Sequence, residues 1–227
     1  MADISQHIKH LDHEHCKQLV HVVFGFVLLL FPFVSIYTLL IASVLVLILL
    51  KYLPEDSILY CIVHDAPSYY ADQSKKPKIR SSYNLVVSIT ILLLIGAVLG
   101  FTSYSYPLYV ISGAFAISTF GVSAANYFNG KNNTGSSRVL YTKYNLTLSS
   151  SIVLLGVGII ASFLASSWIV FWQSTDISYS MVFFISVIGS ITGALFESIP
   201  SRIDDNFLVP LGCGMVIWMF AAFGYYV

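Results

Sequence analysis

Charge and cysteine are both scarce in this sequence. Of its 227 residues, 10% are charged and 57% are hydrophobic, whereas soluble domains carry about 25% charged and about 45–50% apolar residues. The formal net charge of zero offers no basic field to DNA or RNA, which excludes a nucleic-acid partner. The three cysteines are far apart, so they form neither a disulfide framework nor a Cys-x-x-Cys zinc motif. The composition instead predicts an integral membrane protein.

Long apolar runs replace the missing charge. A membrane-spanning helix needs about 20 apolar residues to cross a hydrocarbon core of about 30 Å. The run 19–50 is too long for one such helix, and Pro32 within it would interrupt the helical hydrogen bonds, so we expect two helices there. The span at 146–172 is either one tilted helix or two helices separated at Ser166 and Ser167. The sequence thus predicts an all-α fold, a polytopic membrane bundle of about seven helices, with spans at 18–31, 33–51, 83–101, 106–126, 146–172, 178–197 and 207–226.

The basic residues all fall on one side of this predicted bundle. The N-terminal tail and the connections 52–82, 127–145 and 198–206, together with Lys51 at the adjoining end of the span 33–51, contain all 11 Lys and Arg, whereas the opposite side has Asp176 as its one charged residue. Because Lys and Arg collect in cytoplasmic segments, we expect a cytoplasmic N-terminus and a C-terminus outside. The expected organisation is a cytoplasmic His-rich tail at 1–17 and a single transmembrane domain at 18–227. The membrane would be the plasma membrane of a prokaryote or the endoplasmic reticulum of a eukaryote.

Acidic residues gather between the last two predicted helices. Glu197 ends one apolar span, and Asp204, Asp205 and Asn206 begin the next. Asp and Asn commonly cap helix N-termini, which accounts for one of these acids better than for two. Glu197 is harder to explain in this way, because an acid opposes the dipole of a helix C-terminus and is costly near hydrocarbon. Oxygen ligands grouped like this suit Mg²⁺, which binds one or two carboxylates together with substrate phosphates.

The segment 197–211 resembles the C-terminal signature of the dolichol kinase, phytol kinase and CTP-dependent diacylglycerol kinase family. The shared pattern is Glu-Ser-Ile-Pro, a short gap, Asp-Asp-Asn, and a Pro-Leu pair at Pro210 and Leu211. Members of this family are multi-span enzymes that phosphorylate a lipid alcohol at the cytoplasmic surface, often with CTP as donor. The resemblance implies a Mg²⁺-dependent transfer of the γ-phosphate of CTP or ATP to a polyprenol, phytol-like or diacylglycerol-like alcohol.

The approach to the first helix resembles the Arg-Lys-x-x-His entry motif of the same family. Lys17 stands in the Arg position, Gln18 in the Lys position, and His21 matches the histidine. Taken alone, these residues are more typical of an interfacial histidine and of a lysine whose side chain extends along the membrane to reach water. Together with the acidic turn they form a candidate phosphate-binding group.

The centre of the chain matches the family less closely. Lys131 and Lys143 fall in matching positions, but Val122 follows Gly121 where the family has an aspartate, and Thr147 stands where it has a glutamate. These two differences favour an alternative function, that of a catalytically inactive relative that binds lipid or a protein partner. A cytidylyltransferase acting on a lipid phosphate is a further alternative, because it shares the donor and the type of site.

The resemblance and the acidic turn together suggest a role for each candidate residue. We expect Asp204 and Asp205 to hold Mg²⁺, with Asn206 as a neutral oxygen ligand or a residue that orients a metal-bound water. Glu197 would either help to hold the metal or accept the proton of the lipid hydroxyl. The residues expected to bind the nucleotide phosphates are Lys17, His21, Lys131, Lys143 and Arg202. A carrier is a rival from another class, but carriers place ionisable groups at mid-membrane, and the predicted spans have none there.

Overall fold

A computed structural model describes residues 13–52, 81–100, 107–131, 148–199 and 203–224 of the chain. These residues are almost entirely helical, and no strand occurs among them. The elements in chain order are α2 (His13–Gly25), the 3₁₀-helix η1 (Phe26–Phe33), α3 (Ile36–Lys51), α5 (Ser81–Leu99), α6 (Leu108–Ala116), the π-helix η2 (Ile117–Gly121), α7 (Val122–Lys131), α8 (Leu148–Gln173), α9 (Tyr179–Ser198) and α10 (Asp205–Gly224).

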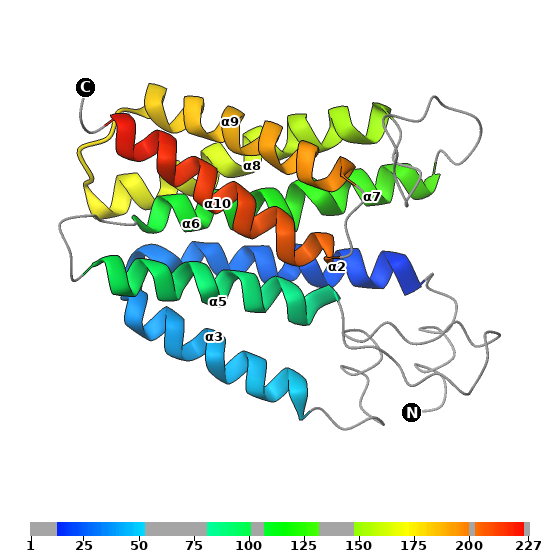
Figure 1. Ribbon diagram of the computed structural model, residues 1–227, viewed down its shortest axis with the longest axis horizontal. Coiled ribbons are helices and arrows are strands. Elements are labelled where there is room, and N and C mark those ends of the chain that lie inside the picture. The colour runs from blue at the N-terminus through cyan, green and yellow to red at the C-terminus, as the bar shows by residue number, and fades with distance from the viewer. Residues whose placement is uncertain (1–12, 53–80, 101–106, 132–147, 200–202, 225–227) are drawn as a thin grey trace.

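Most of these helices have the length and composition of membrane spans. In the described ranges, the five segments long and apolar enough to cross a membrane are Ser82–Leu99, Leu108–Phe128, Leu148–Gln173, Tyr179–Ser198 and Asp205–Ala222. Two shorter apolar helical segments are Gln18–Phe33 and Ile36–Lys51. The helices run along the long axis of the molecule (Figure 1). The fold is therefore the all-helical membrane bundle that the composition predicts, and α8 is one continuous helix with no interruption at Ser166 or Ser167.

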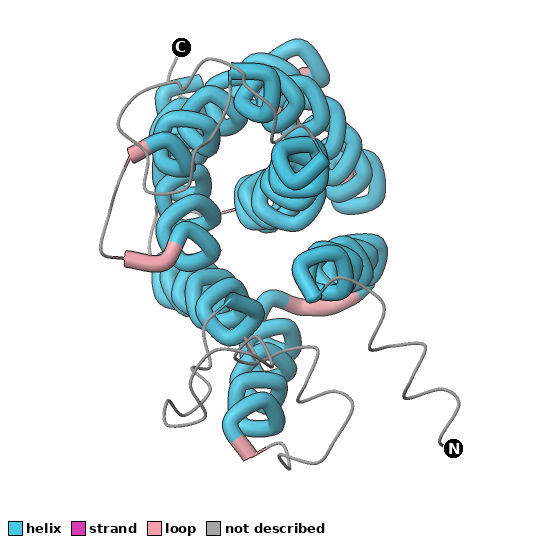
Figure 2. Tube along the Cα trace, turned by 90° about the vertical axis from the view of Figure 1, so that its right-hand side faces the viewer, coloured by secondary structure: helices cyan, strands magenta, loops and turns pink. Residues whose placement is uncertain are grey.

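The passage α6–η2–α7 forms the centre of the bundle. Within the protein, 89% of an 18-residue stretch of Leu108–Phe128 is buried, compared with 28% of a stretch of the same length in Leu148–Gln173. Seen end on, other helices surround this passage, while α3 lies apart at the edge (Figure 2). α3 packs mainly against α5. The bundle thus has a closed half around the central passage and a more open edge at α3.

Glycine and serine bring the central passage close to α8 and α9. A Cβ atom placed on Gly113 would lie 2.8 Å from Ser166 Oγ, and one placed on Gly121 would lie 3.2 Å from the Cα atom of Gly158. Burial against another helix gains little over burial in lipid, so close packing of small residues holds such helices together. We call this contact the glycine–serine seam; it consists of Gly113, Gly121, Gly158, Ser162, Ser166, Gly189, Ser190 and Gly193.

Pro32 does not end the first apolar helix at the boundary expected between 31 and 33. The helix continues as η1 through Phe33, and α3 begins after Ser35, whose Oγ accepts a hydrogen bond from a backbone N–H in its first turn. A 3₁₀-helix pairs each carbonyl with the N–H three residues later, so Pro32 leaves the Leu29 carbonyl without that donor. Trp168 Nε1 of α8 donates to this oxygen at 3.2 Å, which is how proline is tolerated in membrane helices.

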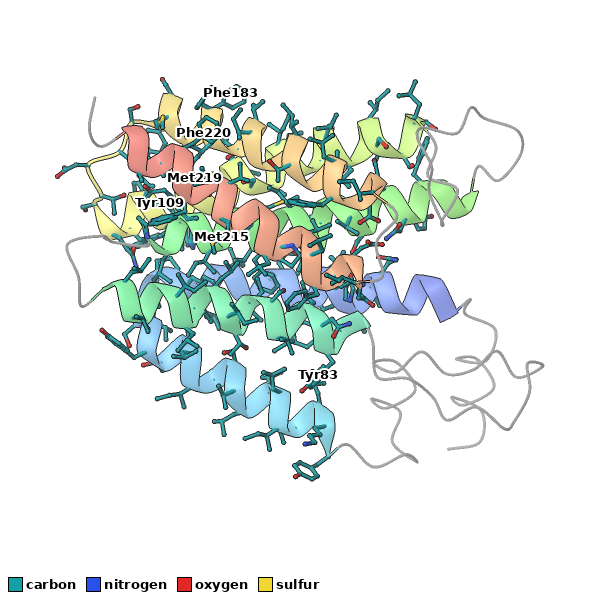
Figure 3. The ribbon with its side chains drawn as sticks, in the orientation of Figure 1. Tyr83, Tyr109, Phe183, Met215, Met219 and Phe220 are labelled. Carbon is teal, nitrogen blue, oxygen red and sulfur yellow. The ribbon has the colours of Figure 1, made fainter. Side chains whose placement is uncertain are left out.

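The outer surface of the bundle is apolar. Phe183 on α9 and Met215, Met219 and Phe220 on α10 are exposed, whereas Tyr109 on α6 is fully buried (Figure 3). Large apolar side chains on the outside and hydroxyls within the glycine–serine seam suit a hydrocarbon solvent rather than water.

Candidate functional site

The polar residues of the two predicted motifs lie at the same end of the bundle. Helices α2, α5 and α10 begin at this end, and α7 and α9 end there (Figure 1, right-hand side). It holds Glu197 at the end of α9, and Asp204 and Asp205 at the start of α10. At the opposite end, the one charged residue within the described ranges is Asp176, in the turn between α8 and α9. We call the first of these the polar end.

His21 lies inside the protein and faces α5. Its side chain is 1% exposed, and its Nε2 atom lies 3.4 Å from Ser82 Oγ at the beginning of α5. Gln18, one turn earlier on α2, is also buried. The structure therefore disfavours the interpretation of His21 as an ordinary interfacial histidine, because its imidazole is enclosed between helices.

Asp204 caps the N-terminus of α10. Its Oδ1 atom accepts the backbone N–H of Asn206 at 2.9 Å and the side-chain amide of Asn206 at 3.0 Å. Asp204 therefore acts as a helix cap, a role that Asp commonly has at helix starts. The other carboxylate oxygen of Asp204 takes part in neither bond. Asp205 follows as the first residue of α10, where the helix dipole favours a negative charge.

Pro210 exposes a backbone carbonyl close to these acids. Proline has no N–H to donate to the carbonyl four residues earlier, which here belongs to Asn206. Ser88 Oγ of α5 approaches that oxygen at 3.5 Å, although its shorter bond, of 2.8 Å, goes to the Leu85 carbonyl of its own helix. Ser88 thus brings α5 close to the backbone of Asn206, beside the acidic start of α10.

Glu197 lies on the inward face of α9. Its side chain is 8% exposed. Gly189 and Gly193, at helical spacing on the same face, approach Ile117 of η2 so closely that Cβ atoms placed on them would lie 3.1 Å and 2.9 Å from its side chain. Glu197 follows Gly193 by four residues and so lies on the same face of α9, the face that packs against the central passage. A buried acid at the end of a membrane helix is a functional-site candidate.

The predicted phosphate-binding residues are placed only in part. Lys143 and Arg202 lie outside the described residues. Lys17 belongs to α2, and Lys131 is the last residue of α7. Thr147, at a position where the family has an acid, also lies outside the described residues, whereas Val122 is buried at the start of α7.

The carboxylates do not form a protein-only metal cage. Among the described residues, no three His, Cys, Asp or Glu side chains come together in a way that could hold a metal ion. Mg²⁺ needs fewer protein ligands, since it is commonly bound by one or two carboxylates plus substrate phosphates and water. Asp204 and Asp205 fit that donor chemistry.

α5 links the two motifs through two serines that carry no sequence signal. Ser82 contacts His21, and Ser88 contacts the Asn206 carbonyl. The two serines are six residues apart, roughly 9 Å along the helix axis. Hydroxyls in membrane helices usually bond a carbonyl of their own helix, so nothing in the sequence distinguishes these two from the others.

Two apolar hollows lie among the described helices. The inner cavity, of about 130 Å³, lies between Phe24, Phe31, Leu39, Val46, Leu85 and Leu93. The outer groove, of about 560 Å³, lies between Phe26, Leu29, Ile160, Leu164 and Trp168, on η1 and α8.

No protein-family model, no curated protein and no solved structure matches this chain.

Proposed function

We propose that this protein is a membrane lipid kinase that transfers the γ-phosphate of CTP or ATP to the hydroxyl of a lipid alcohol. The observation that supports it most is the meeting of two segments, far apart in the sequence, on α5. His21 from the entry motif contacts Ser82, and Asn206 from the C-terminal motif contacts Ser88. Both segments carry the resemblance to the dolichol kinase, phytol kinase and CTP-dependent diacylglycerol kinase family, and one active site built from both requires such proximity.

The acidic start of α10 is the proposed phosphate-transfer centre. Asp205 and the second carboxylate oxygen of Asp204 would hold Mg²⁺, which neutralises charge on the transferring phosphate. The amide oxygen of Asn206 is not used in its bond to Asp204 and is a neutral ligand of the kind Mg²⁺ accepts. The backbone N–H groups that open α10 add the positive end of the helix dipole. Phosphoryl transfer needs positioning and charge neutralisation more than covalent chemistry, and these groups supply both.

The remaining candidates surround this centre in the proposal. Glu197 helps to hold the metal or accepts the proton of the lipid hydroxyl. The residues proposed to neutralise the nucleotide phosphates are Lys17, Lys131, Lys143 and Arg202, with His21. The polar end faces the cytoplasm, because the segments that adjoin it contain the basic residues. This places the N-terminus in the cytoplasm, the C-terminus outside, and the nucleotide on the side where it is abundant.

Label transfer tests the proposal with a matched pair of substitutions. Purified protein would be incubated with Mg²⁺, mixed lipids and CTP or ATP labelled at the γ-phosphate, and the lipids then separated by chromatography. We expect a labelled lipid from the wild type and a loss of at least about 100-fold in Asp205→Asn, because metal charge stabilises the transition state by several kcal/mol. Asp176→Asn makes the same change at the opposite end of the bundle and should leave transfer unchanged.

Three results would each contradict a part of this proposal. Wild-type turnover in a folded Asp205→Asn variant would remove the metal assignment. Label that reaches the lipid from the α-phosphate of CTP would instead show cytidylyl transfer. Nucleotide binding without any labelled lipid would favour an inactive relative, a possibility supported by Val122, which places a buried apolar side chain where the resemblance leads one to expect an acid.

A further inference from the structure

The outer groove opens toward the hydrocarbon of the membrane. It lies between η1 and α8, which belong to the apolar helical segments Gln18–Phe33 and Leu148–Gln173. Leu29, Ile160 and Leu164, which line it, are 52%, 62% and 61% exposed. Its volume of about 560 Å³ is nearly four times that of an engineered apolar cavity of about 150 Å³ that binds benzene. In a bilayer, an open apolar hollow of this size has room for the tail of a lipid.

Three aromatic rings stand together where this groove ends. Trp168, which lines the groove, has its ring centroid 6.4 Å from that of Phe33 and 5.6 Å from that of Trp172, and the Phe33 and Trp172 centroids are 5.0 Å apart. Phe33 ends η1 and Trp172 lies in the last turn of α8, so the three rings lie at the end of the bundle opposite the polar end. We call them the aromatic corner.

The geometry of the aromatic corner suits a bound cation. The three ring planes are inclined to one another by 75°, 73° and 61°, so three faces can meet at one point like the walls of a box corner. A cation about 4 Å from three perpendicular ring faces requires centroids about 5.7 Å apart, within the ~6 Å reach of a cation–π contact. The observed separations lie on both sides of that value. Aromatic cages of this kind recognise quaternary ammonium groups.

The charge of this end also favours a cation. Asp176, four residues after Trp172, is exposed and is the one charged residue at this end within the described ranges. No Lys or Arg among those residues stands here to pair with an anionic head group. A primary ammonium would give up hydrogen bonds to water on entering the aromatic corner, whereas a quaternary ammonium has none to lose.

We propose that the outer groove and the aromatic corner together form a binding site for a choline phospholipid, with one acyl tail in the groove and the trimethylammonium group against the three rings. Trp168 joins the two parts, and its indole N–H, which donates to the Leu29 carbonyl at 3.2 Å, fixes the shared ring. The site lies away from the acidic start of α10 and does not rest on the proposed function. Tryptophan is also common at membrane interfaces as a general anchor, but an anchor does not discriminate between head groups.

Photolabelling with two matched lipids tests the site. The full-length protein would be placed in nanodiscs of phosphatidylglycerol that contain a trace of phosphatidylcholine or phosphatidylethanolamine, each with the same diazirine-bearing tail. We expect label on peptides from η1 and α8. The choline lipid should give at least about threefold more of it than the ethanolamine lipid, because cation–π contacts with a quaternary ammonium contribute a factor of that order.

Two pairs of substitutions separate the head-group part of the site from the tail part. Phe33→Leu should reduce the choline label to the level of the ethanolamine label. Phe183→Leu removes an equally exposed phenylalanine near the start of α9, whose ring contacts Phe163 instead, and should leave the preference unchanged. Ala161→Phe fills part of the outer groove and should reduce the label from both lipids, whereas Ala42→Phe, the same change in the inner cavity, should reduce neither.

The contrary outcomes are distinct. Equal labelling of the wild type by the two lipids would overturn the choline site and leave the three rings as an ordinary interfacial anchor. Equal losses in Phe33→Leu and Phe183→Leu would have the same meaning. Crosslinks between two copies through α8, in place of lipid label, would show that a second copy covers the groove and would also overturn the site. Asp205→Asn, which tests the kinase at the other end of the bundle, should leave the lipid label unchanged.

Discussion

The glycine–serine seam and the walls of the inner cavity are packed in opposite ways. In the seam, Gly121 and Gly158 bring two helix backbones together so closely that even a methyl group would press on the neighbour. Around the inner cavity, large side chains such as Phe31 and Leu93 meet without filling the space between them. In lipid, large apolar side chains gain little by leaving the hydrocarbon for one another, so a sector lined mainly by large side chains stays loosely packed. One half of the bundle is thus closely packed, and the other has room for a ligand.

Gly158→Val should have the largest effect on stability, because it adds a side chain to the closely packed glycine–serine seam. A Cβ atom on Gly158 would lie 3.0 Å from Ser190 Oγ, whereas on Gly156, two residues earlier in α8, nothing lies within 4 Å. Overpacking of a tight contact costs about 1–3 kcal/mol, so the Tm of Gly158→Val in detergent should fall clearly below that of the wild type. Gly156→Val carries the same side chain and should melt close to the wild type. Equal Tm values for the two variants would mean that the seam is not closely packed.

Ala42→Leu should act in the opposite direction. The added carbons would occupy part of the inner cavity, which Ala42 lines, and cavity filling commonly adds about 0.5–2 kcal/mol of stability. Thermal unfolding in the absence of lipid alcohol should show a Tm equal to or above that of the wild type. A decrease as large as that of Gly158→Val would show that this sector is packed as tightly as the seam.

The smallest effects should come from two equivalent helix caps. Ser178 Oγ accepts the Met181 N–H at the start of α9, and Ser35 Oγ accepts the Thr38 N–H at the start of α3. Removing such a cap typically costs about 1 kcal/mol. Because α9 belongs to the seam and α3 packs mainly on α5, Ser178→Ala should lower the global Tm, while Ser35→Ala should mainly speed hydrogen exchange in the first turn of α3. Identical behaviour of the two variants would contradict the division into a closely packed and a loose half.

Hydrophobic runs predicted the long helices well, because their ends carry local signals. The expected span 178–197 corresponds to Tyr179–Ser198, which begins where a serine cap precedes an apolar run. The boundary near Pro32 was less accurate. A 3₁₀ turn needs no N–H from Pro32 once Trp168 satisfies the Leu29 carbonyl, and this contact joins residues 139 positions apart, beyond the reach of any local pattern.

The candidate site was predictable as a set of acids but not as an arrangement. Asp204 and Asp205 stand out because acids are rare in this chain, and the capping role of Asp204 was one of the expected alternatives. Ser82 and Ser88 could not be distinguished from other serines, since their importance comes from what α5 packs against. The inner cavity was equally out of reach, because its volume depends on how side chains from several helices fail to fill a common space.

The π-helix η2 changes how this chain can be compared with others. A π-helical bond joins residues five apart instead of four, so η2 contains one residue more than an ordinary turn and rotates everything after it by roughly 100°. Gly113 and Ile117, before the end of η2, face α8 and α9, while α7, after it, lies against α2 and α8. Aligned with a relative whose helix is regular here, the two halves match only across a one-residue gap. The residue that corresponds to a given position near Gly121 therefore depends on whether the alignment is anchored on α6, before the gap, or on α7, after it.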